Sequence, residues 1–143
     1  MSAGTALDLL AAAPTPDPAR ARPAVARVLQ GAGADLILFA FAPGQSLPDH
    51  RAAHPILVQC LRGALDFTWG GRTVRLEAGT AVHLPAGITH RVDRPAEGAP
   101  AGAPDEGPGG AAGGGPDAAA VLLLSMLTGA PDPKDPPAPP PAG

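Results

Sequence analysis

The sequence has little cysteine, almost no lysine and no basic stripe. Cys60 is the only cysteine among 143 residues, which excludes an internal disulfide framework and a zinc site made of thiolates. The 10 Lys and Arg residues are outnumbered by 13 Asp and Glu, and the formal net charge is −3. Because a protein that binds nucleic acid needs clustered positive charge to neutralise phosphates, we expect no nucleic-acid partner.

The sequence also lacks a long apolar run and a targeting segment. Its most apolar stretch, Ala118 to Leu127, is ten residues long, about half of what a helix needs to cross a bilayer. The N-terminal segment has no basic region, and Asp8 interrupts its apolar run, unlike a secretory signal. We therefore expect no membrane partner and a cytoplasmic location.

Glycine and proline are unevenly distributed along the chain. There are 19 Gly and 20 Pro in total, but only 11 of them lie within residues 35–95. A short helix is predicted from Thr5 to Ala13, with Thr5 and Asp8 forming a capping box. The distribution predicts these segments: an N-terminal arm over 1–34, a β-domain over 35–128, a flexible Gly/Pro-rich insertion within it at 96–117, and a disordered Pro-rich tail over 129–143.

Short apolar segments alternate with turn signals after residue 35, as in an all-β sandwich or barrel. Gly70-Gly71 predicts a two-residue hairpin turn. The composition of 118–127 permits a buried helix as well as a strand; we predict a strand, because the sheet would otherwise keep an open edge. The predicted strands are 35–42, 55–62, 64–69, 72–77, 80–84, 90–94 and 118–127.

Two spacings of glycine, proline and histidine suggest a family. Residues 79–90, GTAVHLPAGITH, resemble the second signature of the cupin superfamily, and Gly44-x5-His50 followed by Gly63 resembles part of the first. The resemblance covers 35–95, with 118–127 by analogy. It implies a small single-domain cupin, an antiparallel β-barrel of the double-stranded β-helix or jelly-roll type. In such a barrel the mouth is the expected ligand site.

The resemblance also implies a metal site, which is incomplete here. The family pattern takes two histidines and a glutamate from the first motif and one histidine from the second. His50 and His90 match, whereas Ala52 and Ile56 occupy the other two positions. His54 shares a strand face with His50, so His50, His54 and His90 are candidate ligands of one divalent ion, Zn, Fe, Ni or Cu. Four residues of strand span about 13 Å, so a shared ion requires a bend; otherwise His54 is a loop residue.

Further residues are candidates for the ligand pocket. Ile56 and Val58 alternate towards the interior. Arg94 lies an even number of residues after His90, the second-motif histidine, so both side chains point to the same side of the strand. Arg94 is either an anion ligand at the mouth or a solvated arginine at the end of the strand. Cys60 is interpreted as a buried apolar residue rather than a reactive thiol, and His83 as an exposed residue of the barrel wall.

Together these features predict a small-molecule-binding cupin-domain protein. Two alternatives stay open: a metal-dependent cupin enzyme, an oxygenase or isomerase with a histidine-only site, and a non-catalytic regulatory or structural β-domain. No nucleophile motif or phosphate-binding loop supports another chemistry. We expect a homodimer, because the barrel offers edge strands to pair and the N-terminal arm needs a surface to dock on.

Overall fold

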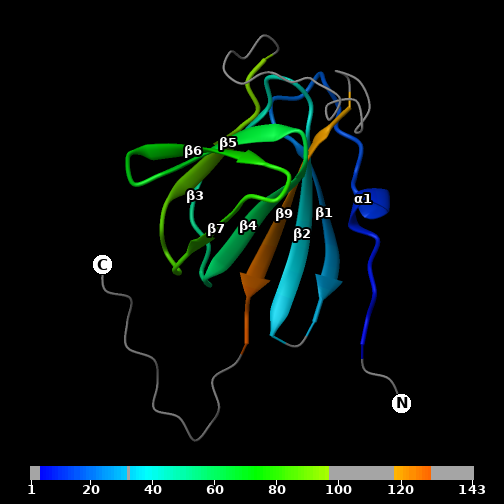
Figure 1. Cartoon of the computed structure of the whole chain (residues 1–143), viewed down its shortest axis with the longest axis vertical. Coiled ribbons are helices and arrows are strands. Elements are labelled where there is room, and N and C mark those ends of the chain that lie inside the picture. The colour runs from blue at the N-terminus through cyan, green and yellow to red at the C-terminus, as the bar shows by residue number, and fades with distance from the viewer. Residues whose placement is uncertain (1–3, 32, 97–117, 130–143) are drawn as a thin grey trace, which may run out of the picture.

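The computed structural model describes residues 4–31, 33–96 and 118–129. Within these residues nearly all of the regular secondary structure is β-strand, and the only helix is a single short turn (Figure 1). The elements are α1 (Leu9–Ala12), β1 (Ala24–Gln30), β2 (Ala34–Phe41), β3 (Ser46–His50), β4 (Ile56–Arg62), β5 (Ala64–Trp69), β6 (Arg72–Glu77), β7 (Ala81–Leu84), β8 (His90–Asp93) and β9 (Ala120–Leu127).

The strands form two antiparallel sheets, and the predicted jelly-roll fold is confirmed. One sheet has the order β1-β2-β9-β4-β7 and the other β3-β8-β5-β6. The alternation of side chains along each strand buries one face of each sheet; in β4, for example, Ile56, Val58 and Cys60 are buried. A single hydrophobic cluster from both sheets fills the space between them, so the core lies between the two layers.

The β5–β6 hairpin has the predicted turn. Gly70 and Gly71 have φ angles of 59° and 79°, the left-handed region that a two-residue hairpin turn needs and that glycine adopts without strain. The turn pairs Trp69 with Arg72, and the register continues to Ala64 opposite Glu77. This register decides which side chains of the hairpin share a face with those of β8.

Two strands lie where the sequence analysis assigned none. β1 is an edge strand with a largely exposed or half-buried pattern, so it lacks a clear hydrophobic alternation. β3 contains Pro48 and Asp49, residues that are unusual in strands. Its pairing with β8 is irregular between Leu47 and His50, and this irregularity accommodates the proline, which has no N–H to donate.

The last strand completes the larger sheet. β9 pairs antiparallel with β2 on one side and with β4 on the other. The prediction of a strand over 118–127 is therefore confirmed, and the helical alternative is wrong. Five consecutive residues from Ala120 are buried, because the inner face of β9 contacts the core and its outer face is also covered.

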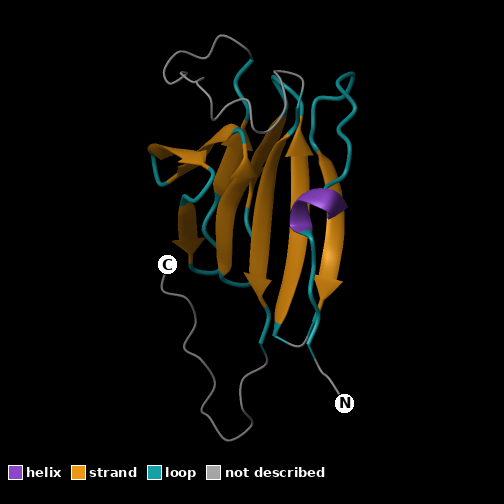
Figure 2. Cartoon of the chain, turned by 45° about the vertical axis from the view of Figure 1, so that its right-hand side comes forward, coloured by secondary structure: helices purple, strands orange, loops and turns teal. Residues whose placement is uncertain are grey.

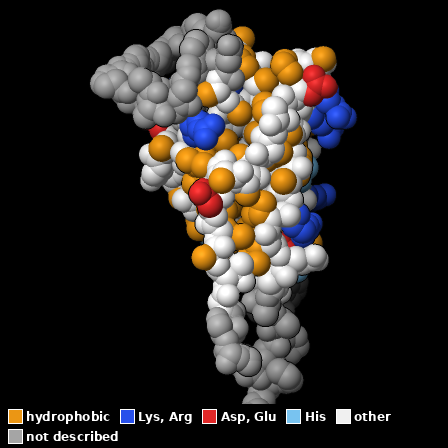
Figure 3. Space-filling model, turned by 90° about the vertical axis from the view of Figure 1, so that its right-hand side faces the viewer, with side chains coloured by type: hydrophobic (Ala, Val, Ile, Leu, Met, Phe, Trp, Pro, Cys, Tyr) orange, Lys and Arg blue, Asp and Glu red, His pale blue; other side chains and the backbone are white. Residues whose placement is uncertain are grey.

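The N-terminal helix is shorter than predicted and begins later. α1 spans four residues. Its N-cap is Asp8, whose carboxylate accepts a hydrogen bond from the Ala11 N–H at 3.2 Å, so the predicted cap at Thr5 is wrong. Leu9 and Ala13 pack against buried residues on the outer face of the larger sheet, and Figure 2 shows the helix in front of that sheet. This side of the molecule presents many hydrophobic side chains at its surface (Figure 3).

Gln45 attaches the segment that follows α1 to the β2–β3 turn. The side chain is only 2% exposed. Its Oε1 accepts a hydrogen bond from the Ala42 N–H, and its Nε2 donates to the carbonyl oxygens of Asp17 and Arg20. A buried amide with all these partners stabilises the contact. The N-terminal arm thus docks on its own chain.

The predicted insertion at 96–117 and tail at 129–143 lie, apart from Ala96 and Gly129, outside the described residues. Among the described helices, none has the length and apolar character needed to cross a membrane.

Candidate functional site

His50 and His90 lie side by side at the end of β3 and the start of β8. Their Cα atoms are register partners, which places both rings on the same face of the sheet. The ring centroids are 4.5 Å apart at an interplanar angle of 62°. His90 is only 2% exposed, whereas His50 is exposed. We refer to this end of the domain, where β3 ends and β8 begins, as the mouth.

The His90 ring has one hydrogen-bonding atom without a partner. Its Nδ1 lies 3.0 Å from the Ile88 carbonyl oxygen; because a carbonyl only accepts, Nδ1 is the donor and carries the proton. Nε2 is buried and has no hydrogen-bond partner among the described residues. In the neutral ring this atom has a lone pair that can accept a hydrogen bond or bind a metal.

Burial keeps the His90 ring neutral. Removal from water lowers the pKa of His90 below its usual 6.5, because the charged form loses hydration. The hydrogen bond to the Ile88 carbonyl and the nearby Asp49 carboxylate oppose this lowering, and the neighbouring His50 adds to it. At neutral pH the mouth therefore contains a buried acceptor rather than a buried cation.

Aromatic and cationic side chains continue the histidine pair across the smaller sheet. The register pairs His90 with Trp69, and Trp69 with Arg72. Phe67 on β5 contacts two members of this row: its ring centroid lies 5.5 Å from that of His90 and 5.6 Å from that of Trp69. The Arg72 guanidinium carbon lies 5.0 Å from the centroid of the Trp69 ring. We call His50, His90, Trp69 and Arg72 the inner row.

The sequence analysis missed half of the inner row. It named neither Trp69 nor Arg72 as a candidate site residue. One signal was available: a two-residue turn at Gly70-Gly71 makes Trp69 and Arg72 a cross-strand pair. Their alignment with His90 depends on the pairing of β5 with β8, strands that are not adjacent in sequence, and no local pattern reports that pairing.

A shallow cavity lies between the segment that follows β3 and the segment that precedes β8. Its volume is about 330 Å³, and its lining residues are Arg51, Ala52, Ala53, Ala86 and Gly87. The Gly87 N–H donates to the Ala52 carbonyl at 2.9 Å, which ties the segment after His50 to the segment before His90. The volume is at the lower end of the range for small-molecule sites.

His54 does not join the other two histidines in a three-residue group. It is exposed and lies in a bend after β3. Among the described residues, no three His, Cys, Asp or Glu side chains are placed so that they could hold a metal ion. Ala52 packs against the core and Ile56 is buried, and neither has a donor atom. Two imidazole nitrogens are present, but the described residues do not fit a complete metal site of the family pattern.

The residues predicted to line a pocket have other contacts. Ile56 and Val58 belong to the hydrophobic core, with 1% and 0% exposure. Arg94 donates from Nη1 to the carbonyl oxygens of Phe41 and Ala118, at 2.6 and 3.0 Å. These bonds join the end of β8 to the larger sheet, and burial lowers the pKa of Arg94. Arg94 therefore has a visible role in connecting the two sheets.

The single thiol is protected. Cys60 has 0% exposure, and its Sγ–H donates to the Arg62 and Gly63 carbonyl oxygens, both at 3.3 Å. Burial raises the pKa of Cys60 to about 11, so the reactive thiolate is scarce at neutral pH. The exposed position of His83 on β7 agrees with the prediction of a wall residue.

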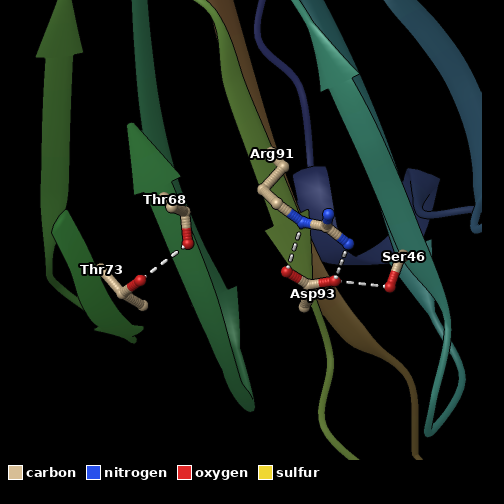
Figure 4. A network of polar contacts seen from close by, with 5 residues as sticks. All are labelled: Ser46, Thr68, Thr73, Arg91 and Asp93. Carbon is tan, nitrogen blue, oxygen red and sulfur yellow. Dashed lines mark hydrogen bonds and ion pairs between the residues drawn. The ribbon is translucent and has the colours of Figure 1, made fainter. Parts of the chain in front are cut away.

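Polar side chains on the outer face of the smaller sheet bind one another (Figure 4). Asp93 accepts hydrogen bonds from the Ser46 hydroxyl at 2.6 Å and from two nitrogens of Arg91 at 2.8 and 2.9 Å. The hydroxyl oxygens of Thr68 and Thr73 are 2.9 Å apart. Because these groups already have partners, they offer no free binding atom comparable to His90 Nε2.

Solved structures share the fold at low sequence identity. A protein from Thermus thermophilus is 22% identical with a TM-score of 0.63, covering 87% of this chain and 98% of its own. A double-stranded β-helix protein from Klebsiella pneumoniae is 14% identical, with a TM-score of 0.63 and coverage of 89% and 92%. An RmlC-like cupin protein from Desulfovibrio desulfuricans is 16% identical, with a TM-score of 0.59 and coverage of 91% and 99%.

The family comparison agrees with these structures. No curated protein shows significant sequence similarity to the chain. The family described as Cupin domain matches residues 37–101. These residues include both histidines of the mouth and most strands of the two sheets. Together, the match over residues 37–101 and the shared fold support a cupin-type domain in this part of the chain.

Proposed function

We propose that this protein binds a small organic molecule at the mouth, beside His50 and His90. The observation that carries the proposal is the buried Nε2 of His90, which has no partner among the described residues. An unsatisfied buried polar atom costs about 1–3 kcal/mol. A ligand that donates a hydrogen bond to this nitrogen removes that cost and gives the atom a role.

The exposed His50 ring can regulate access to this nitrogen. His50 lies against the His90 ring and makes no hydrogen bond among the described residues that would hold it there. A rotation of its side chain is therefore inexpensive, since exposed rotamers exchange readily. The cavity of about 330 Å³ between the segments that follow His50 and precede His90 supplies space for a small molecule.

A screen with matched histidine variants tests this proposal. Small compounds bearing hydroxyl or amine groups are screened by ligand-observed NMR against the wild type, His90→Phe and His83→Phe. Binding is expected in the wild type and in His83→Phe, where the changed residue is exposed on β7, and is expected to disappear in His90→Phe. Hits that bind His90→Phe as well as they bind the wild type would place the ligand elsewhere and end the proposal.

A metal-dependent enzyme, an oxygenase or isomerase, is the second candidate. It is favoured by the lone pair of His90 Nε2 next to a second imidazole, which together give two nitrogen donors for a divalent ion. The full proposal for this candidate uses His50, His54 and His90 as ligands of Zn, Fe, Ni or Cu. It requires His54 to move towards the other two, because the described residues do not hold them together.

Metal titration separates the two candidates. For the metal site, calorimetry with each ion followed by elemental analysis should give one bound ion per chain, lost in His50→Ala, His54→Ala and His90→Phe. For the organic ligand alone, His50→Ala should keep or tighten binding, because it uncovers Nε2. Absence of bound metal in the wild type after reconstitution would remove the second candidate.

A non-catalytic regulatory or structural β-domain, the homodimer and the cytoplasmic location stay predictions. Leu7, Leu10 and Val25 are exposed large hydrophobic residues, and β1 is a free edge of its sheet among the described strands. Both features are suited to self-association. Size-exclusion chromatography with light scattering, on the full chain and on a Leu7→Ser/Leu10→Ser variant, should give a dimer that the double substitution weakens. A monomer in both samples would exclude the homodimer.

A further inference from the structure

Arg72 is an oriented cation without an acidic partner. Its guanidinium stacks on the Trp69 ring, 5.0 Å from the centroid. Three other arginines, Arg27, Arg75 and Arg91, form ion pairs with aspartates, but among the described residues Arg72 has none. Stacking on an aromatic face leaves the N–H groups at the edge of the guanidinium plane free. Trp69 thus fixes the orientation of Arg72 and leaves its donors available.

The fold places this cation on the same row as the unpartnered acceptor. His90, Trp69 and Arg72 are successive register partners on β8, β5 and β6. Trp69 packs against the core between the sheets, so the row lies on the inner face. Adjacent strands are about 4.8 Å apart, and two such steps separate the backbones at His90 and Arg72 by about 10 Å. A small organic molecule can span that distance.

Resting on the proposed function, we propose that Arg72 binds the carboxylate of a small hydroxy acid whose hydroxyl donates to His90 Nε2. Trp69 is a positioning residue that holds the guanidinium. A planar carboxylate matches the two parallel N–H groups of one guanidinium. A phosphate dianion is the weaker fit, because the described residues offer no lysine and no helix N-terminus at this row to complete its neutralisation.

Two other arginines, Arg94 and Arg51, lack this combination of free donors and an orienting aromatic ring. Arg94 uses its donors on two backbone carbonyls. Arg51 lines the cavity, but no aromatic ring among the described residues orients it. If an arginine simply attracted anions by its charge, Arg51 and Arg72 would contribute alike; under the present proposal only Arg72 discriminates a carboxylate from a neutral group.

The sole tryptophan of the chain, Trp69, reports binding directly. Its fluorescence is followed during titration with ω-hydroxyhexanoate, with the neutral ω-hydroxyhexanamide and with hexanoate, which lacks the hydroxyl. For the wild type we expect saturable binding of the hydroxy acid, with at least tenfold weaker binding of the amide and of hexanoate. Arg72→Gln should weaken the hydroxy acid about tenfold and abolish the difference between acid and amide, and Arg72→Lys should restore only part of it.

Control variants separate this inference from the proposed function. Arg27→Gln, on β1, should bind the hydroxy acid as the wild type does. Equal affinity of the wild type for acid and amide, or a loss of discrimination in Arg51→Gln instead of Arg72→Gln, overturns the role of Arg72. If no probe binds the wild type, the hydroxy-acid assignment is overturned, while the fragment screen with His90→Phe still decides whether the mouth binds a ligand.

Discussion

The two faces of the smaller sheet handle their polar groups in opposite ways. On the outer face, Asp93 is bound by Ser46 and Arg91, and Asp66 is paired with Arg75 at 2.8 Å. The register makes the two aspartates neighbours across β5 and β8, and each of them is neutralised by its own arginine, Asp66 by Arg75 and Asp93 by Arg91. On the inner face, the row from His50 to Arg72 keeps an acceptor and a cation unpaired. The outer face of this sheet therefore pairs its polar groups with one another, whereas the inner face leaves polar groups available to a ligand.

The inner face should contribute far more to stability than the outer face. Phe67 has 0% exposure and contacts both His90 and Trp69. Phe67→Ala is expected to lower the free energy of unfolding by about 3–5 kcal/mol, because it removes a buried ring and leaves a cavity. Urea denaturation followed by Trp69 fluorescence measures this. The neighbouring outer-face variant Thr68→Ala should lose about 1 kcal/mol or less; equal losses would contradict the contrast.

His90 should be a position where stability is given up for binding. We expect His90→Phe to raise the free energy of unfolding by about 1–3 kcal/mol, since it replaces an unsatisfied buried acceptor with an apolar ring. The lowered pKa of His90 means that the unfolded chain binds a proton more readily than the folded one. Wild-type stability therefore falls as the pH drops below 6.5, towards the folded pKa, and levels off below it.

Chemical denaturation between pH 5 and pH 7.5, about the range in which histidine titrates, checks both parts of this expectation. The advantage of His90→Phe over the wild type should grow as the pH falls. His83→Phe, with its changed side chain on the surface of β7, serves as the matched control. If the free energy of unfolding had the same pH dependence in His90→Phe as in the wild type, the buried His90 ring would not be what destabilises the folded protein at acidic pH.

Local patterns predicted the elements whose signals are short in sequence. The alternation in β4 and β5 and the glycines of the β5–β6 turn specify strands and a hairpin directly. The cupin-like spacing around His90 works in the same way, because a turn motif a few residues long positions that histidine. For these parts, residue type and spacing are sufficient.

Depth and long-range register could not be predicted in this way. The alternation of side chains along the strand placed Ile56 and Val58 on the interior side. Alternation does not distinguish a core position from a position in the wall of a cavity. It likewise could not show that Arg94 reaches the Phe41 carbonyl, more than fifty residues away. Arg72 joins the inner row only through the β5–β8 pairing, which depends on the assembled sheet.

Asp93 should show a moderate effect on the outer face. Hydrogen bonds from Arg91, and then from Ser46, lower its pKa below the usual 3.8. Because Asp93 is half-buried and its partner Arg91 is partly exposed to water, Asp93→Asn is expected to cost about 1 kcal/mol at neutral pH. The stabilisation is present above pH 3.8 and is lost as the pH falls through the lower folded pKa. Acid titration of stability should flatten in Asp93→Asn, and an unchanged acid limb would contradict this assignment.

The Thr68–Thr73 pair should show the smallest effect and set the lower limit of the contrast. Its two hydroxyls are 2.9 Å apart and exposed, so each can bond to water when the other is removed. Valine keeps the shape and the β-branched preference for strands. Thr68→Val and Thr73→Val should each change the free energy of unfolding by about 0.5 kcal/mol or less, with a coupling energy of similar size in the double-mutant cycle. A coupling energy of about 2 kcal/mol, typical of buried networks, would contradict this expectation. It would mean that the outer face is more than a solvated surface. The two faces would then differ less in their contributions to stability than the burial of their side chains implies.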